Sequence, residues 1–183
     1  MPGLTGLLSR IFGSEIPATV PDDPSPPTVS DPVNRAVGMV GRGRYRLGKG
    51  GRDPRALSPF DGGECDCSGF ASWCLGLDRF QPGRIDGDWI ATTSIHRDAT
   101  GPKRMFRAVP IEEARAGDLV VYPSRYRAGM RVSIGHVGVV VERTGDGWDG
   151  LRVIDCAGRK GAAVAYRAGT LWGAKGGIVA RRV

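Results

Sequence analysis

Cys67 is the residue whose type and position most directly suggest covalent chemistry in this chain. Asp66 before it is a good helix N-cap, and the apolar residues at positions 67, 70, 71 and 74 recur at the spacing of one helix face. The pattern therefore predicts a helix that begins at Cys67. In a first helical turn, unpaired backbone N–H groups and the helix dipole stabilise the thiolate, which is the nucleophilic form. Cys67 is thus a candidate nucleophile; the alternative is a small buried apolar side chain.

A nucleophilic cysteine needs a base, and the sequence contains two histidines, His96 and His136. His136 stands near the start of a run rich in β-branched residues, 135–142, which predicts a strand. His96 lies in a weakly patterned stretch and is interpreted as a surface residue. His136 is therefore the candidate base.

Asp155 is the candidate third residue, and it lies in the next predicted strand, 151–157. If the connection spans 143–150, the antiparallel register pairs Glu142 with Leu151, Val140 with Val153 and Gly138 with Asp155. Asp155 then lies diagonal to His136 on one face of the sheet, with Gly138 leaving room between them and residue 156 on the other face. In that place the carboxylate would orient the imidazole.

The predicted site needs no metal or cofactor. Backbone N–H groups at the helix start would bind the oxyanion of the reaction intermediate, with Ser68 as an additional donor. Cys65 and Cys67 are too close in sequence for an ordinary disulfide, and their spacing is not a usual zinc motif. The alternative is a metal site made of Cys65, Cys67, Cys74 and His136. Free thiols indicate a reducing compartment.

The elements that must position these residues are predicted to form one domain. Residues 1–32 are expected to be a flexible segment with a proline-rich linker at 17–32, and the folded domain spans 33–183. Helices are predicted at 33–40 and within 89–99, with a helical turn at 111–114. Strands are predicted at 117–123, 135–142, 151–157 and within 171–180. Helices followed by an antiparallel meander indicate an α+β fold.

The chain has 183 residues and a net charge of +7 at pH 7, which favours contact with anionic polymers such as nucleic acid, anionic lipid or bacterial wall. It lacks zinc-finger spacing and an RNP-type aromatic motif, so specific nucleic-acid binding is not predicted. Apolar residues at 4–12 fit one helical face, which suits an assembly partner or a membrane surface. They are too few for a signal peptide or a transmembrane segment, which predicts synthesis in the cytoplasm.

Four motifs, taken in order, resemble those of the NlpC-type cysteine peptidases of bacterial cell walls, which are related to CHAP domains. They are YRLGKGG at 45–51, DCSGF at 66–70, GDLVVY at 117–122 and GHVGVV at 135–140. The resemblance implies a papain-like α+β fold, in which an antiparallel sheet packs against the helix that carries the catalytic cysteine. It also implies cleavage of amide bonds in the stem peptides of peptidoglycan, often between D-glutamate and a diamino acid.

The same resemblance assigns Cys67 as nucleophile and His136 as base. The third residue of the family is commonly a histidine, where this chain has Asp155. The segment between nucleophile and base is long, and we expect Trp89 and the loop at 125–131 to shape the substrate groove. The candidate substrate-binding residues are Tyr45, which matches a tyrosine lining the family's site, Ser68 and Trp89.

The sequence thus predicts a bacteriolytic peptidoglycan hydrolase, such as an endolysin, with stem peptides as its binding partner. Delivery to the wall would follow from phage lysis, a virion or a specialised secretion system. The first alternative is a CHAP-like amidase or a thiol acyltransferase on a non-wall substrate. The second is an inactive structural module of a phage or secretion assembly, attached through the N-terminal segment.

Overall fold

The computed structural model of this chain describes residues 31–158 and 162–183. The predictions for the apolar face at 4–12 and for most of the proline-rich linker lie outside these residues. No helix in the described ranges is long and apolar enough to cross a membrane.

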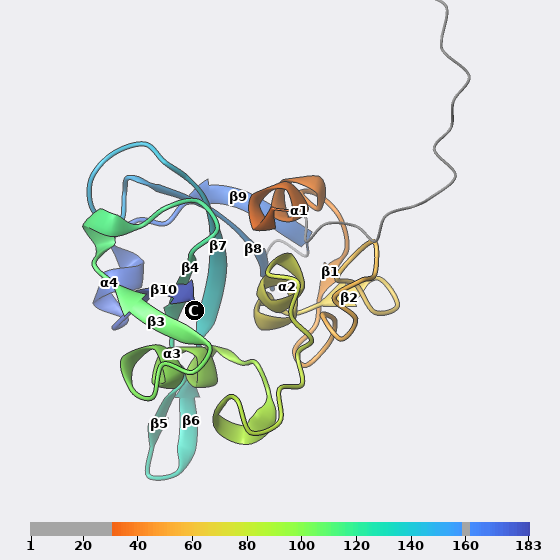
Figure 1. The fold of residues 1–183 in the computed structure, drawn as a ribbon, viewed down its shortest axis with the longest axis horizontal. Helices are drawn as coiled ribbons and strands as arrows, with labels where there is room; N and C mark the ends of the chain where they lie inside the picture. Colours follow the sequence, from red (N-terminus) through yellow and green to blue (C-terminus); the bar gives the residue numbers. More distant parts are fainter. Residues whose placement is uncertain (1–30, 159–161) are drawn as a thin grey trace, which may run out of the picture.

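A six-stranded antiparallel sheet is the centre of the fold (Figure 1). In spatial order its strands are β3 (Phe106–Val109), β10 (Ile178–Arg182), β4 (Leu119–Tyr122), β7 (His136–Arg143), β8 (Leu151–Ala157) and β9 (Ala162–Arg167). The predicted strands at 117–123, 135–142 and 151–157 are confirmed as β4, β7 and β8. The predicted C-terminal strand is β10, which returns to pair with both β3 and β4.

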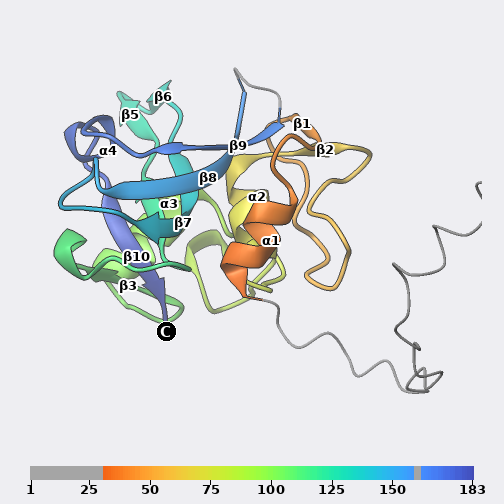
Figure 2. The same ribbon diagram turned by 90° about the horizontal axis from the view of Figure 1, so that it is seen from above.

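Three helices pack on one face of the sheet: α1 (Pro32–Gly38), α2 (Cys67–Cys74) and α3 (Thr92–Thr100). They bury one apolar cluster with β4, β7 and β8, whose largest members include Phe70 of α2 and Ile95 of α3. The short helix α4 (Leu171–Ala174) lies on the opposite side of the sheet (Figures 1 and 2). Its Trp172 belongs to a second apolar cluster. The predicted α+β class, with an antiparallel sheet packed against the helix of Cys67, is confirmed.

Between Val140 and the His136 end of β7, the register of β7 and β8 agrees with the prediction. Val140 pairs with Val153 as expected. The predicted pair of Glu142 with Leu151 is wrong, because a bulge after Val140 moves Glu142 opposite Arg152. The bulge lies away from His136, so Asp155 still reaches the His136 face, while residue 156 points to the helix side.

The region 78–117, which carries the weakest sequence pattern, folds into short elements around α3. They are η2 (Asp86–Asp88), β3 and η3 (Ile111–Glu113). Asp98 of α3 ties them together, since its carboxylate accepts hydrogen bonds from the backbone N–H groups of Arg104, Met105 and Phe106. The helix predicted within 89–99 and the turn predicted at 111–114 are confirmed.

Two small β structures lie at the edge of the molecule. β1 (Arg44–Tyr45) pairs in parallel with β2 (Glu64–Cys65), just before α2. β5 (Arg125–Arg127) and β6 (Met130–Ser133) form a hairpin between β4 and β7. This hairpin projects away from the sheet in Figure 1. The loop predicted at 125–131 is therefore an ordered two-stranded arm next to His136.

Candidate active site

Cys67 is the first residue of α2, and Asp66 is its N-cap, as predicted. One carboxylate oxygen of Asp66, Oδ1, accepts hydrogen bonds from the backbone N–H of Gly69 at 2.7 Å and from the hydroxyl of Ser68 at 3.0 Å. This cap leaves the N–H groups of Cys67 and Ser68, at the start of the helix, available for another acceptor. Cys67 is only 3% exposed, so its sulfur lies in a nearly closed site.

Arg79, which the sequence reading missed, holds the start of α2 in place. Its guanidinium donates to Asp66 Oδ2 and to Ser68 Oγ, each at 2.7 Å, and to the carbonyl of Lys49 at 3.0 Å. The side chains of Arg79 and Asp66 are each only 2% exposed. A lone arginine in a weakly patterned stretch gives no local signal for this contact, which joins residues far apart in sequence.

The glycine-rich motif at 45–51 supports the same helix start. The N–H of Gly48 donates to Asp66 Oδ2 at 2.7 Å. Gly51 has a φ of +69°, and a Cβ there would lie 2.1 Å from the carbonyl oxygen of Gly69. A side chain at either glycine of that contact would push the loop off the helix. The motif therefore acts as packing surface for α2.

His136 and Asp155 form a buried pair across β7 and β8. His136 Nε2 lies 2.5 Å from Asp155 Oδ2, and Asp155 is fully buried. Tyr166 of β9, also missed from the sequence, donates its hydroxyl hydrogen to the same oxygen. Asp155 Oδ1 has no hydrogen-bond partner within the described ranges. A carboxylate that accepts from an imidazole and a phenol through one oxygen is well suited to fix the histidine tautomer.

Cys67 is the second side chain that acts on His136. Burial alone would lower the pKa of His136, but the hydrogen bonds with Asp155 and Cys67, and the charges of both, outweigh it and raise the pKa from 6.5 to about 10. Since Asp155 occupies Nε2, the nitrogen left for the thiol is Nδ1. The structure thus brings Cys67, His136 and Asp155 together in the order that the sequence predicted, with His136 and not His96 beside the thiol.

The raised pKa of His136 predicts a stability that depends on pH. The folded state holds this proton more tightly than the unfolded chain, so the stabilisation is complete below about pH 6.5 and is lost as the pH rises toward about 10. We expect the free energy of unfolding from denaturant titrations to fall across this window. The slope should be smaller in His136→Gln, and equal slopes in the two proteins would disprove the assignment.

The three candidate substrate-binding residues have different surroundings. Tyr45 of β1 is half-buried beside Cys67; burial, together with the nearby charges of Cys67 and Asp66, raises its pKa. The hydroxyl of Ser68 is engaged by Asp66 and Arg79, which directs its hydrogen away from a substrate. The centroid of the Trp89 ring lies 5.0 Å from the guanidinium carbon of Arg79. Trp89 therefore contacts the arginine that holds the start of α2.

An aromatic wall covers the other side of His136. Trp172 of α4 lies 5.6 Å from the His136 ring and 5.1 Å from Tyr122, measured between ring centroids. Tyr122 lies opposite His136 in the β4–β7 register. Trp172 is buried, so it restricts the motion of both rings.

The other three cysteines are buried and differ from Cys67 in their surroundings. Burial is the main cause of a raised pKa for the thiols of Cys65 and Cys74, and it raises the pKa of Cys156 to about 12. All four are free thiols. Within residues 31–158 and 162–183, no group of three or more His, Cys, Asp or Glu side chains could hold a metal ion.

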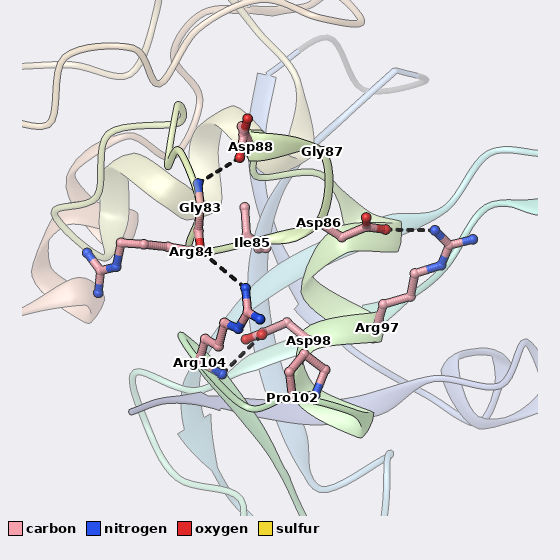
Figure 3. Close-up of a pocket in the computed structure, with 10 residues that line it drawn as sticks. All are labelled: Gly83, Arg84, Ile85, Asp86, Gly87, Asp88, Arg97, Asp98, Pro102 and Arg104. Carbon is pink, nitrogen blue, oxygen red and sulfur yellow. Dashed lines mark hydrogen bonds and ion pairs between the residues drawn. The ribbon is translucent and has the colours of Figure 1, made fainter.

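A separate hollow of about 480 Å³ lies between η2 and α3 (Figure 3). Most of its charged groups are satisfied within the wall: Arg97 pairs with Asp86 at 2.7 Å, and Arg104 donates to the carbonyl of Gly83 at 3.2 Å. The hollow contains none of the predicted site residues. Its lining is Gly83, Arg84, Ile85, Asp86, Gly87, Asp88, Arg97, Asp98, Pro102 and Arg104.

The solved structures that resemble this chain include distant similarities. No family model and no curated protein matches the sequence. A hypothetical invasion protein of Mycobacterium tuberculosis superimposes with a TM-score of 0.47 at 16% identity, over 84% of this chain and 61% of that one. A lipoprotein-like protein of the NLP/P60 family from Staphylococcus aureus gives 0.37 at 22% identity, over 80% and 44%. This chain therefore spans less than two thirds of either protein.

Proposed function

We propose that this chain is a cysteine peptidase that hydrolyses an amide bond in the stem peptides of bacterial peptidoglycan. The observation that carries the proposal is the arrangement of Cys67 at the start of α2, beside His136, whose Nε2 is held by buried Asp155. The four motifs that resemble NlpC-type cell-wall peptidases support the choice of substrate, with the bond between D-glutamate and a diamino acid as the preferred target.

The mechanism follows from these positions. The Cys67 thiolate attacks the carbonyl carbon of the scissile amide, while imidazolium His136 balances its charge. The N–H groups of Cys67 and Ser68 stabilise the oxyanion that forms. His136 then donates its proton to the leaving amine, which departs and leaves a thioester on Cys67. A water molecule that gives a proton to His136 hydrolyses the thioester and releases the acid product and the thiolate. Asp155 keeps the imidazole in the tautomer that serves both steps.

The surroundings of the site suit a wall peptide. Tyr45 would line the groove beside Cys67, and Trp89 would form a more distant part of its wall behind Arg79. The net charge of +7 favours approach to an anionic wall. Delivery by phage lysis, a virion or specialised secretion is part of the same proposal.

Selective thiol labelling tests the nucleophile. We expect iodoacetamide at neutral pH to modify Cys67 faster than Cys65, Cys74 or Cys156, because those three thiols have raised pKa values. Release of soluble fragments from purified peptidoglycan should be lost in proportion to Cys67 modification. Labelling of Cys67 without any wall hydrolysis would favour an acyltransferase or an amidase on a non-wall substrate. An unreactive Cys67 would favour a structural module.

A further inference from the structure

Two cationic side chains lie together on the Tyr122 side of the site. Lys175, just after α4, donates from Nζ to the Tyr122 hydroxyl at 3.1 Å and lies 4.6 Å from the centroid of the Tyr122 ring. Arg125, at the start of the β5–β6 hairpin, donates to the carbonyl of Ala174 at 3.4 Å, which places its guanidinium next to the Lys175 segment. Within the described part of the chain, neither cation makes an ion pair with a carboxylate.

The two segments that carry Arg125 and Lys175 contain no acidic residue. Residues 119–141, which include β4, the hairpin and the start of β7, contain no Asp or Glu, and neither do residues 156–183. The carboxylate of Asp155, beside His136, is buried and already accepts from His136 and Tyr166. Within residues 31–158 and 162–183 the positive charges of Lys175 and Arg125 are thus not neutralised by an ion pair and can attract an anionic group of a ligand.

This cationic pair is close to the reacting groups. The centroid of the Tyr122 ring lies 6.2 Å from that of His136, and Trp172 packs against both rings. The Lys175 ammonium lies 4.6 Å from the Tyr122 centroid, and one residue of an extended peptide spans roughly 3.3–3.6 Å, so Lys175 lies within about three residues of the His136 ring. A group bound there would belong to a residue flanking the bond that is cut.

We propose that Lys175, Tyr122 and Arg125 form a subsite for a substrate carboxylate next to the scissile amide. This inference rests on the proposed function. Tyr122 accepts a hydrogen bond from Lys175, so its own hydroxyl hydrogen can be donated outward. The ammonium and the phenol then offer two adjacent donors, which match the two oxygens of a carboxylate, and Arg125 adds charge at the rim. The α-carboxylate of a γ-linked D-glutamate has this place in a stem peptide.

Binding to the Cys67→Ala protein tests the subsite without turnover. Calorimetry would compare a synthetic stem peptide whose D-glutamate carries a free α-carboxylate with the same peptide as the α-carboxamide. We expect the carboxylate peptide to bind about tenfold more tightly or better, because only the carboxylate can accept charge-assisted hydrogen bonds with both of its oxygens. Adding Lys175→Met should bring the ratio of the two affinities close to one.

Matched variants separate the subsite from general charge and from folding defects. Lys103→Met removes one positive charge from the exposed segment after α3 and should keep the full preference. Tyr122→Phe should reduce the preference without removing the cation. Equal binding of the two peptides, no binding of either, or a preference that survives Lys175→Met would overturn the subsite. Hydrolysis of peptidoglycan by the wild-type protein is measured separately. A preference for the carboxylate peptide without hydrolysis would contradict the proposed function and leave the subsite supported.

Discussion

Replacing Asp155 by asparagine is expected to lower kcat for peptide hydrolysis roughly a hundredfold or more. Both donors, His136 Nε2 and the Tyr166 hydroxyl, point at the same oxygen of Asp155. An asparagine would have to place its carbonyl oxygen there, and it would lack the negative charge that stabilises imidazolium. Its NH₂ group would replace Oδ1, which has no partner within the described ranges, and so add an unsatisfied buried donor.

A matched control is Asp146→Asn, because Asp146 is an exposed aspartate that forms an ion pair with Arg143. This control should change kcat less than twofold. Far-ultraviolet circular dichroism should show that Asp155→Asn keeps the native secondary structure. An unchanged kcat in a folded Asp155→Asn protein would mean that another group orients His136.

Replacing Arg79 by methionine is expected to lower the free energy of unfolding by about 3–5 kcal/mol, which would make it the most destabilising change considered. Methionine fills much of the same volume, but it leaves Asp66 as a buried carboxylate without its cation. The hydroxyl of Ser68 and the carbonyl of Lys49 lose a donor as well. Urea titration measures the loss.

The chain offers a control for this change in Arg97→Met, which removes an arginine from an ion pair of the same 2.7 Å length with Asp86. That pair is exposed on both sides, so its loss should cost less than about 1 kcal/mol. If the two substitutions cost the same, burial of the Arg79–Asp66 pair does not stabilise the start of α2.

The parts of the fold that local signals specify were predictable. The N-cap Asp66 and the helical spacing after Cys67 identify α2, since both act within one or two turns of chain. The strands at β4, β7 and β8 follow from β-branched runs. The pairing of β7 with β8 also follows, because a short connection limits the register to few choices, although the bulge after Val140 was not foreseen.

The rest of the site depends on contacts between residues far apart in sequence. Arg79 is joined to the loop at Lys49, and Lys175 reaches Tyr122 across 53 positions. Tyr166 comes from β9, a strand that was not predicted from the sequence. Such contacts are set by how elements pack, and no periodicity or capping signal reports them. The three catalytic positions could be predicted from the sequence because each begins or lies within a strongly patterned element.

The most direct test of the central claim is digestion of purified peptidoglycan by the wild type and by Cys67→Ala, with released fragments identified by mass spectrometry. We expect soluble muropeptides from the wild type alone, with intact sugar chains and a new amine and carboxyl terminus within the stem peptide. Thermal unfolding would show that Cys67→Ala is folded. Equal release by the two proteins, or fragments cut within the sugar chain, would contradict hydrolysis of a peptide amide by the Cys67 thiolate.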